Sequence, residues 1–338
     1  MSYKPKKLTE SYKSMLGALV GDAAGAVLEF CHDTITDKMA QRAITMPGGG
    51  SIRTGPGQIT DDGELALCLW RALNASNAHN TLEYPYEECF KEYAEWYDSM
   101  PFDIGRTCSL AFSAASYRLK KTKGIFNDNI KKLILHTIHS DNETSEANGA
   151  LMRITALPTW AIQHGISVKN TVQMAKDDAL VSHPNIVCQE VNAVYVFAIM
   201  NLLLGVKPDI TLTLTTEFVN KYVSSDKVRT WFFEESLDYQ RMECIKNMGH
   251  VRYAFGLAIY FLRNPQISYE KAIHMTLLKG GDTDTNAAIV GGLVACYQPI
   301  PEYMLNPVLS FDSTKCNRER KGHFRSEKYC VKYVLDIE

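Results

Sequence analysis

A glycine at every fourth position of one apolar segment is the feature that most restricts how this chain can fold. In the segment 16–30, which runs from Leu16 to Phe30, the glycines are Gly17, Gly21 and Gly25. A glycine inside a helix costs about 1 kcal/mol relative to alanine, and residues four apart lie on one face of a helix. Three glycines in this register predict a buried helix over 16–30, with the backbone of another element packed closely against its glycine face.

The rest of the chain predicts an all-α fold. Apolar residues recur at helical spacing in five further segments, which is typical of helices with one buried face. These segments are 65–73, 86–96, 110–119, 187–204 and 251–262. The best candidate for strand-like alternation is 210–214, which is equally compatible with the start of a helix. Without an internal repeat or a long linker, we expect a single domain built as a helical bundle.

Composition limits the possible partners. The 338 residues are 46% hydrophobic and 22% charged, as in an ordinary soluble domain with a sizeable core. The formal net charge of −2 gives no general attraction to nucleic acid, so we expect no nucleic-acid partner. The longest apolar stretch, 194–206, is shorter than the roughly 20 residues that a membrane-spanning helix needs. We therefore expect no membrane segment, and we expect a monomer.

Cysteine usage predicts a location. The chain has 9 cysteines, an odd number, and no Cys-x-x-Cys pair. This pattern argues against structural zinc and against a disulfide framework. The apolar segment near the N-terminus is also interrupted by Asp22, which makes it a poor signal peptide. We expect a cytoplasmic, reducing environment.

A cluster of side-chain oxygens lies near the C-terminus. After Gly280 and Gly281 come Asp282, Asp284 and Thr285, immediately before the apolar run 287–296. Carboxylates and hydroxyls are ligands for Mg²⁺, which binds oxygen. The cluster is also compatible with a simple helix N-cap, because Asp and Thr are good caps and suit the positive end of a helix dipole.

A second cluster has the same construction, since a glycine-rich turn delivers Thr60, Asp61 and Asp62 to the start of the apolar run 65–70. Asp61 could cap this helix with Glu64 three residues later, as in a variant capping box. That arrangement leaves Asp62 unexplained, and adjacent carboxylates repel one another unless a cation lies between them. The two clusters therefore predict the two halves of one metal site.

A third pair of acids lies in the glycine-rich segment. Asp22 and Glu29 are seven residues apart and so share one face of the predicted helix. Burying unpaired charges on an apolar helix is unfavourable. Either acid alone is more typical of a paired or surface carboxylate, whereas two acids on one face of this apolar helix indicate a functional role.

Five motifs in this order resemble the ADP-ribosylglycohydrolase family, which includes dinitrogenase reductase-activating glycohydrolase and the ADP-ribosyl-acceptor hydrolases. The motifs are Gly-x-x-x-Gly-Asp-x-x-Gly-x-x-x-Glu at 17–29, Gly-Gln-x-Thr-Asp-Asp at 57–62, Asn-Gly-Ala-x-Met-Arg at 148–153, Ser-His-Pro at 182–184 and Gly-Gly-Asp-Thr-Asp-Thr-Asn-Ala at 280–287. One departure is Gly63, where many members carry Thr. The resemblance implies an all-α domain over 8–300, with 301–338 as a C-terminal extension of unknown role.

The resemblance also implies a binuclear metal cleft that holds two Mg²⁺ or Mn²⁺ ions. The positions that match the family's metal ligands are Thr60, Asp61, Asp62, Asp282, Asp284 and Thr285. The positions that match its substrate cleft are Asp103, Gly105, Ser145, Asn148, Gly149, Met152 and His183. The segments 103–107 and 145–152 as a whole also resemble the family's substrate-cleft segments. The catalytic candidates are Asp62, Asp61 and Glu29. Asp62 is the first candidate for general base because capping leaves it unexplained, and Asp61 and Asp62 could also divide these roles in the opposite order.

The activity that the resemblance implies is metal-dependent cleavage of the glycosidic bond between ADP-ribose and an acceptor. We expect the acceptor to be a protein side chain, with arginine as the first choice, so that the enzyme reverses mono-ADP-ribosylation. The expected partner is an ADP-ribosylated protein or another ADP-ribose conjugate. A catalytically inactive ADP-ribose-binding or structural relative is the alternative. A haloacid-dehalogenase phosphatase is disfavoured, because glycines rather than a hydrophobic strand precede Asp282.

Overall fold

The computed structural model describes residues 12–31, 33–317 and 321–335. Over this part of the chain the only extended pairings are two isolated bridges, Gly49 with Thr54 and Ala147 with His250. The predicted domain start at residue 8 and the charged residues 318–320 lie outside the described residues. The prediction of an all-α fold is confirmed.

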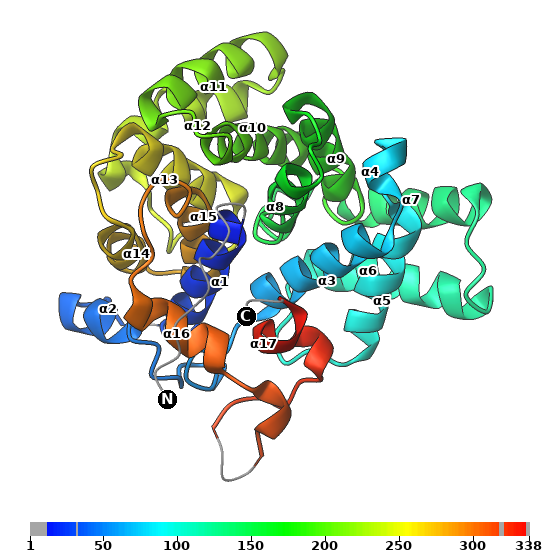
Figure 1. The fold of residues 1–338 in the computed structure, drawn as a ribbon, viewed down its shortest axis with the longest axis horizontal. Coiled ribbons are helices and arrows are strands. Elements are labelled where there is room, and N and C mark those ends of the chain that lie inside the picture. The colour runs from blue at the N-terminus through cyan, green and yellow to red at the C-terminus, as the bar shows by residue number, and fades with distance from the viewer. Residues whose placement is uncertain (1–11, 32, 318–320, 336–338) are drawn as a thin grey trace.

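The α-helices follow one another around a central pair (Figure 1). In chain order they are α1 Lys13–Gly25, α2 Asp37–Ala43, α3 Asp61–Ala75, α4 Ala78–Thr81, α5 Tyr86–Asp98, α6 Arg106–Lys121, α7 Asp128–Asn142, α8 Ala156–Gln163, α9 Val168–Leu180, α10 Ile186–Leu203, α11 Pro208–Tyr222, α12 Asp226–Phe233, α13 Val251–Arg263, α14 Tyr269–Leu277, α15 Thr283–Val294, α16 Glu302–Ser310 and α17 Val331–Val334. Short 3₁₀ turns lie at Glu235–Leu237, Tyr239–Arg241, Ser313–Lys315 and Glu327–Tyr329.

The central pair is α1 and α15, which lie side by side in the middle of the molecule (Figure 1). The α1 glycines are the points of contact. A Cβ atom would lie 2.3 Å from the carbonyl oxygen of Gly291 if added at Gly17, and 2.0 Å from that of Ala287 if added at Gly21. The predicted backbone-to-backbone packing is therefore present, and its partner is the helix that begins with the C-terminal Asp/Thr cluster.

The prediction that this helix continues to residue 30 is wrong, because α1 ends at Gly25. The Gly25 carbonyl oxygen accepts hydrogen bonds from the Thr283 hydroxyl at 2.8 Å and from the Leu28 backbone N–H at 2.9 Å. These bonds replace the helical bond to the fourth following residue and turn the chain. Phe30 then adopts a left-handed φ of 51°. Glu29 consequently lies in the turn after α1 and not on a helical face shared with Asp22.

Helices α11 and α10 resolve two ambiguities of the sequence pattern. The segment 210–214 lies inside α11, a helix with Pro208 in its first turn, where proline favours helix initiation. Helix α10 is long and apolar enough to cross a membrane by length and composition alone, but 78% of it is buried inside the molecule. It is therefore placed as a core helix, and α9, α11 and α13 pack around it.

The C-terminal segment returns to the N-terminal half of the chain. Helix α16 packs on α1, and α17 with the preceding 3₁₀ turn packs on α3 (Figure 1). Arg325 in this segment is 5% exposed. The tail thus contributes buried contacts on the side of the molecule where α3 begins.

Candidate active site

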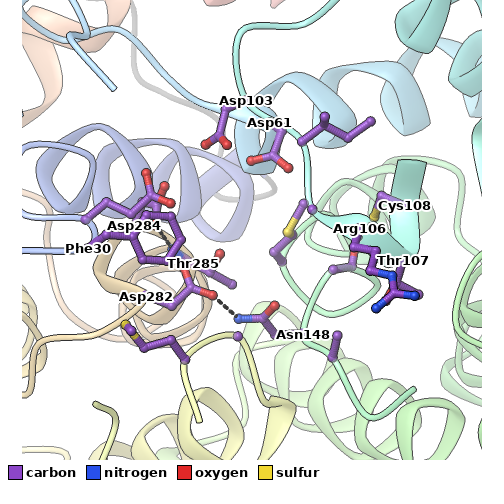
Figure 2. A pocket seen from close by; sticks show the side chains of 18 of the residues that line it. Phe30, Asp61, Asp103, Arg106, Thr107, Cys108, Asn148, Asp282, Asp284 and Thr285 are labelled. Carbon is purple, nitrogen blue, oxygen red and sulfur yellow. Dashed lines mark hydrogen bonds between the residues drawn. The ribbon is translucent and has the colours of Figure 1, made fainter. Parts of the chain in front are cut away.

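A cavity of about 320 Å³ lies where the starts of α3, α6 and α15 meet (Figure 2). Its walls come from seven separate parts of the chain. They are formed by Glu29, Phe30, Asp61, Asp103, Ile104, Gly105, Arg106, Thr107, Cys108, Ala147, Asn148, Gly149, Met152, His183, Met248, Gly249, Asp282, Asp284 and Thr285.

Carboxylates gather at one end of this cavity. Asp61 comes from the first residue of α3, and Asp282 and Asp284 come from the start of α15. Glu29 reaches the cavity from the turn after α1, and Asp103 from the loop before α6. Figure 2 shows Asp61 and Asp103 near each other, with Asp284 and Asp282 along the same wall. Segments far apart in the sequence thus combine into one acidic surface.

Asp22 lies behind this surface and fixes the start of α3. Its carboxylate accepts hydrogen bonds from the Thr60 backbone N–H at 3.0 Å, from the Thr60 hydroxyl at 2.9 Å and from the Gly63 N–H at 2.9 Å. A Cβ atom at Gly63 would lie 2.7 Å from Oδ2 of Asp22. The glycine that departs from the family pattern is therefore what allows this close approach.

The capping-box variant predicted for α3 is wrong. The N-cap residue is Thr60, whose hydroxyl accepts a hydrogen bond from the Asp62 N–H at 3.4 Å. The Glu64 side chain does not turn back to the N-cap of α3. Its carboxylate accepts a hydrogen bond from Nε1 of Trp96 at 2.7 Å and forms an ion pair with Arg325 at 2.8 Å. Similarly, Asp282 is the N-cap residue of α15 but makes no capping hydrogen bond with its side chain.

The buried carboxylate oxygens form two overlapping groups. Oxygens of Asp22, Asp62 and Asp284 lie within 4.8 Å of one another, and so do oxygens of Glu29, Asp103 and Asp284. Oδ1 of Asp62 accepts a hydrogen bond from the Thr285 hydroxyl at 3.0 Å. The other oxygen of Asp62, and Oε2 of Glu29, are buried with no hydrogen-bond partner among the described residues.

This donor set fits divalent cations. Hard cations such as Mg²⁺ and Mn²⁺ take carboxylate and hydroxyl oxygens, and buried carboxylates without partners are unfavourable unless something compensates their charge. Asp284 belongs to both groups of oxygens.

In the absence of a cation, this crowding favours protonated carboxyls. Burial, reinforced by the charges of Asp103 and Asp282, raises the pKa of Glu29 to about 9. Burial and the charge of Asp282 raise the pKa of Asp103 to about 6. The pKa values of Asp61 and Asp284 are raised well above the ordinary range, first by burial and then by neighbouring acids. A bound cation would reverse these shifts because it favours the charged form.

The opposite wall of the cavity has a different character. It is formed by the start of α6, and Figure 2 shows Arg106, Thr107 and Cys108 across the cavity from Asp284. Gly105 is the N-cap residue of α6 and supplies no capping side chain. The backbone N–H groups at the start of a helix attract anions. With Arg106 beside them, they make this wall complementary to a negatively charged group.

The loop before α8 closes the third side. The side-chain amide of Asn148 donates a hydrogen bond to Oδ2 of Asp282 at 2.7 Å, and its backbone N–H donates to the carbonyl oxygen of Gly249 at 2.9 Å. A Cβ atom at Gly149 would lie 2.8 Å from Sγ of Cys108 and 3.0 Å from the ring of His183. A glycine is needed here for α6, this loop and His183 to meet.

His183 is oriented by a buried network. Arg153 donates hydrogen bonds to Oδ2 of Asp178 at 3.0 Å and to the Ser182 hydroxyl at 2.9 Å, and that hydroxyl lies 2.8 Å from Nδ1 of His183. Because arginine has only donors, Ser182 accepts from it and gives its own hydrogen to Nδ1. Burial and the nearby Arg153 lower the pKa of His183 to about 3. The neutral ring therefore carries its hydrogen on Nε2.

Most residues predicted for the site line the cavity, and three do not. Thr60 and Asp62 are buried behind the lining residues at the start of α3. Ser145 is outside the lining, and its hydroxyl lies 2.9 Å from that of Thr107. The segments 103–107 and 145–152, which the resemblance assigned to the substrate cleft, also supply Ile104, Arg106, Thr107 and Ala147 to the lining. The lining residues outside every predicted site segment are Phe30, Cys108, Met248 and Gly249.

Their proximity to known motifs could have identified some of these residues. Phe30 directly follows Glu29, and Cys108 directly follows the segment 103–107. Met248 and Gly249 belong to no motif. Backbone contacts between segments far apart in the chain hold them at the cavity, among them the hydrogen bonds from the Asn148 N–H to the Gly249 carbonyl and from the Val251 N–H to the Glu146 carbonyl.

Comparison with known proteins places this cavity in a family. The family model for ADP-ribosylglycohydrolase matches residues 5–320. The chain is 27% identical over 324 residues to L543 of Acanthamoeba polyphaga mimivirus, named as an ADP-ribosyl glycohydrolase, with 89% of this chain and 91% of that protein covered. It is 28% identical over 283 residues to the ADP-ribosyl-[dinitrogen reductase] glycohydrolase of Rhodospirillum rubrum, with 83% of this chain and 82% of that protein covered.

A solved structure described as an ADP-ribosylglycohydrolase-related protein complex shares the fold. It superposes with a TM-score of 0.67 at 22% sequence identity, over 89% of this chain and 93% of that chain. The family match, the two relatives and the cavity built from the family's motifs agree with one another. The chain therefore belongs to the ADP-ribosylglycohydrolase family and is an enzyme of the ADP-ribosyl glycohydrolase type.

Proposed function

We propose that this enzyme releases ADP-ribose from ADP-ribosylated proteins and that the acceptor is an arginine side chain. The observation that carries the proposal is the polarity of the cavity, with carboxylates at one end and the start of α6 with Arg106 at the other. The name of the Rhodospirillum rubrum relative, which identifies a protein as its substrate, supports a protein substrate here as well.

The two ends of the cavity suit the two parts of ADP-ribose. The diphosphate is an anion, and the N-terminus of α6 with Arg106 offers backbone N–H donors and a guanidinium group. With the diphosphate there, the ribose that carries the acceptor points towards the carboxylates of Asp61 and Asp284.

The acidic end favours a cationic acceptor. Glu29 and Asp103 line the cavity beside Asp284, which is more negative charge than a neutral serine or ester linkage would require. A guanidinium group binds carboxylates in a two-pronged geometry. Arginine therefore matches this part of the cavity better than serine does.

Two divalent cations, Mg²⁺ or Mn²⁺, complete the proposed site. Their ligands would come from Thr60, Asp61, Asp62, Asp282, Asp284 and Thr285. Bound cations supply the positive charge that orients the ribose hydroxyls and lowers the pKa of a bound water.

The lining of the cavity favours Asp61 over Asp62 as the group that exchanges a proton with the substrate. Asp61 faces the cavity, whereas Asp62 lies behind it and accepts the Thr285 hydroxyl. Glu29 also faces the cavity, and its position beside Asp103 suits it to orient the leaving guanidinium. The sequence favoured Asp62 as the general base, so the choice of Asp61 reverses that assignment. Cleavage at the anomeric carbon passes through an oxocarbenium-like state, which these carboxylates would stabilise.

Release of ADP-ribose from Arg-, Ser- and ester-linked conjugates tests the proposal, with each conjugate assayed in Mg²⁺, in Mn²⁺ and in EDTA. We expect release from the arginine linkage that depends on a divalent cation. Release from the serine or ester linkage alone would overturn the acceptor assignment. Tight binding of ADP-ribose without any release would favour the inactive ADP-ribose-binding alternative.

The proposed location is the reducing interior of a cell, because the number of cysteines is odd.

A further inference from the structure

The C-terminal segment 321–335 reaches the active site from behind through Arg325. Its guanidinium donates hydrogen bonds to the Glu64 carboxylate at 2.9 and 2.8 Å, to the Ser99 hydroxyl at 2.8 Å and to the Ser99 carbonyl oxygen at 3.2 Å. Glu64 lies on α3 two residues after Asp62, and Ser99 lies four residues before Asp103. One side chain of the tail therefore connects the helix that carries the acidic cluster to the loop that carries Asp103.

His323 makes a second connection to the same loop. Its ring stacks on Phe102, with centroids 4.1 Å apart and planes 5° from parallel. Nε2 of the ring donates to the carbonyl oxygen of Ile52 at 2.6 Å. Phe102 immediately precedes Asp103, so the stack fixes the backbone from which the Asp103 carboxylate enters the cavity.

The backbone around His323 is held as firmly as its ring. The His323 N–H donates to Oε1 of Gln58 at 2.9 Å, and Nε2 of Gln58 donates to the His323 carbonyl oxygen at 2.8 Å. The preceding Gly322 has a φ of +109°. A Cβ atom at Gly322 would lie 2.6 Å from Oε1 of Gln58. This glycine is therefore required for the tail to lie against the loop before α3.

These contacts are specific and buried. Glu64 is 1% exposed and Arg325 is 5% exposed. A buried ion pair depends on correct geometry, since removal of either partner leaves an unpaired buried charge. A tail that only covered the surface would not need buried contacts of this kind.

We propose that the segment 321–335 is part of the active site and that His323 and Arg325 are positioning residues for Asp103. They hold the loop 99–105 against α3, so that Asp103 faces the acceptor side of the cavity. The effect on the acceptor rests on the function proposed above, whereas the effect on the loop does not.

The test compares the full-length His323→Ala variant with the parent enzyme, both loaded with Mn²⁺. We expect amide hydrogen exchange of residues 99–105 to become faster. We expect KM for an arginine-linked conjugate to rise roughly tenfold through loss of the stack, while kcat and the affinity for free ADP-ribose change by less than about twofold. His323→Phe retains an aromatic ring, so its exchange of residues 99–105 and its KM should both lie close to the parent values.

Two further variants complete the design. Phe102→Leu removes the same stack from the loop side and should reproduce His323→Ala, so the test remains valid if His323→Ala does not fold. Glu327→Ala changes an exposed side chain of the same segment and should leave exchange and KM unchanged.

The outcomes separate the two proposals. Unchanged exchange of residues 99–105 in both stack variants would overturn the positioning role. Faster exchange with an unchanged KM would limit the tail to a stabilising role and would also overturn it. If the parent enzyme does not cleave the arginine conjugate, the proposed function fails, and exchange of the loop still tests the contact.

Discussion

Arg106 alone, among the described residues that line the cavity, carries a full positive charge at neutral pH. Its position at the N-terminus of α6 predicts that Arg106→Ala weakens ADP-ribose binding about tenfold, as expected for the loss of one charge-assisted contact. Titration calorimetry at low and high salt measures this affinity, and the difference between parent and variant should shrink at high salt.

Lys121→Ala is the matched control, because Lys121 is a cation at the opposite end of the same helix. It should bind ADP-ribose as the parent does. Equal losses in the two variants would mean that general electrostatic attraction, and not a contact at the start of α6, accounts for the effect.

His183 should remain neutral in the folded protein at pH 5, with its hydrogen on Nε2. Its lowered pKa of about 3 means that the unfolded chain binds an additional proton between about pH 3 and 6.5. This group therefore makes the folded protein less stable as the pH falls through 6.5. Imidazole ¹⁵N chemical shifts would report both charge and tautomer.

Ser182 is responsible for this tautomer in our interpretation. Ser182→Ala removes the hydroxyl that donates to Nδ1 and should give a mixture of tautomers, whereas Ser182→Thr retains a hydroxyl and should give the parent spectrum. A pure Nε2–H form in Ser182→Ala would show that another group sets the tautomer.

For individual residues, the sequence is informative where several acidic or hydroxyl side chains lie in one short motif. The clusters at Asp61 and Asp282 could be recognised because adjacent acids after glycines have few structural explanations. The partner of Glu64 could not, since Arg325 lies 261 residues away and local spacing suggested a capping role instead. Local spacing does not predict the partner of a buried carboxylate that pairs with an arginine far away in the sequence.

Among the elements, the contact between α1 and α15 gives the clearest prediction. Gly21→Ala would place a Cβ atom 2.0 Å from the Ala287 carbonyl oxygen, so the two helices must separate. Such overpacking typically costs about 1–3 kcal/mol. We expect a lower free energy of unfolding in chemical denaturation, together with weaker binding of Mn²⁺, because α15 carries Asp284.

Lys132→Ala, on the exposed side of α7, controls for the helical substitution itself. Its stability should stay within about 0.5 kcal/mol of the parent. A Gly21→Ala protein as stable as the parent would mean that the helices can separate without cost, contrary to the packing seen here.

Helix positions were predictable from periodicity, but helix ends were not. The apolar pattern continues beyond Gly25, yet α1 stops there because the Thr283 hydroxyl takes the Gly25 carbonyl. Likewise, the alternating residues 210–214 are helical because a proline begins α11. In both cases a single contact or residue decides between patterns that apolarity alone permits.

For the whole molecule, pH and metal should act on stability in opposite ways. Folding raises the pKa of Glu29 to about 9 and that of Asp22 to about 7, so the metal-free folded protein holds protons that the unfolded chain releases. Its stability from these groups is present below about pH 4 and is lost as the pH rises through the raised values. Cations should offset this loss by replacing the protons.

Thermal unfolding in EDTA and in Mn²⁺ at about pH 6 and about pH 8 measures this effect. We expect the increase in Tm on adding Mn²⁺ to be larger at the higher pH. Asp284→Asn, which removes the carboxylate common to both groups of oxygens, should abolish most of the increase. An equal increase at both pH values would contradict competition between protons and metal.

The overall architecture was only partly accessible from sequence. The glycine register predicted that another backbone packs on the first helix, but nothing in it identified α15 as that helix. The role of the tail was also inaccessible, because Arg325 and His323 belong to no recognised motif and their partners lie in the first third of the chain. Long-range contacts of this kind depend on the assembled fold.

The hydrogen bond between Thr285 and Asp62 joins residues that are 223 positions apart. During synthesis, the first half of the site leaves the ribosome long before the second half exists. Until then α1 has no helix for its glycine groove, and the acids at Asp61 and Asp62 have no counterpart across the cavity. The acidic site can therefore form only after α15 has been translated.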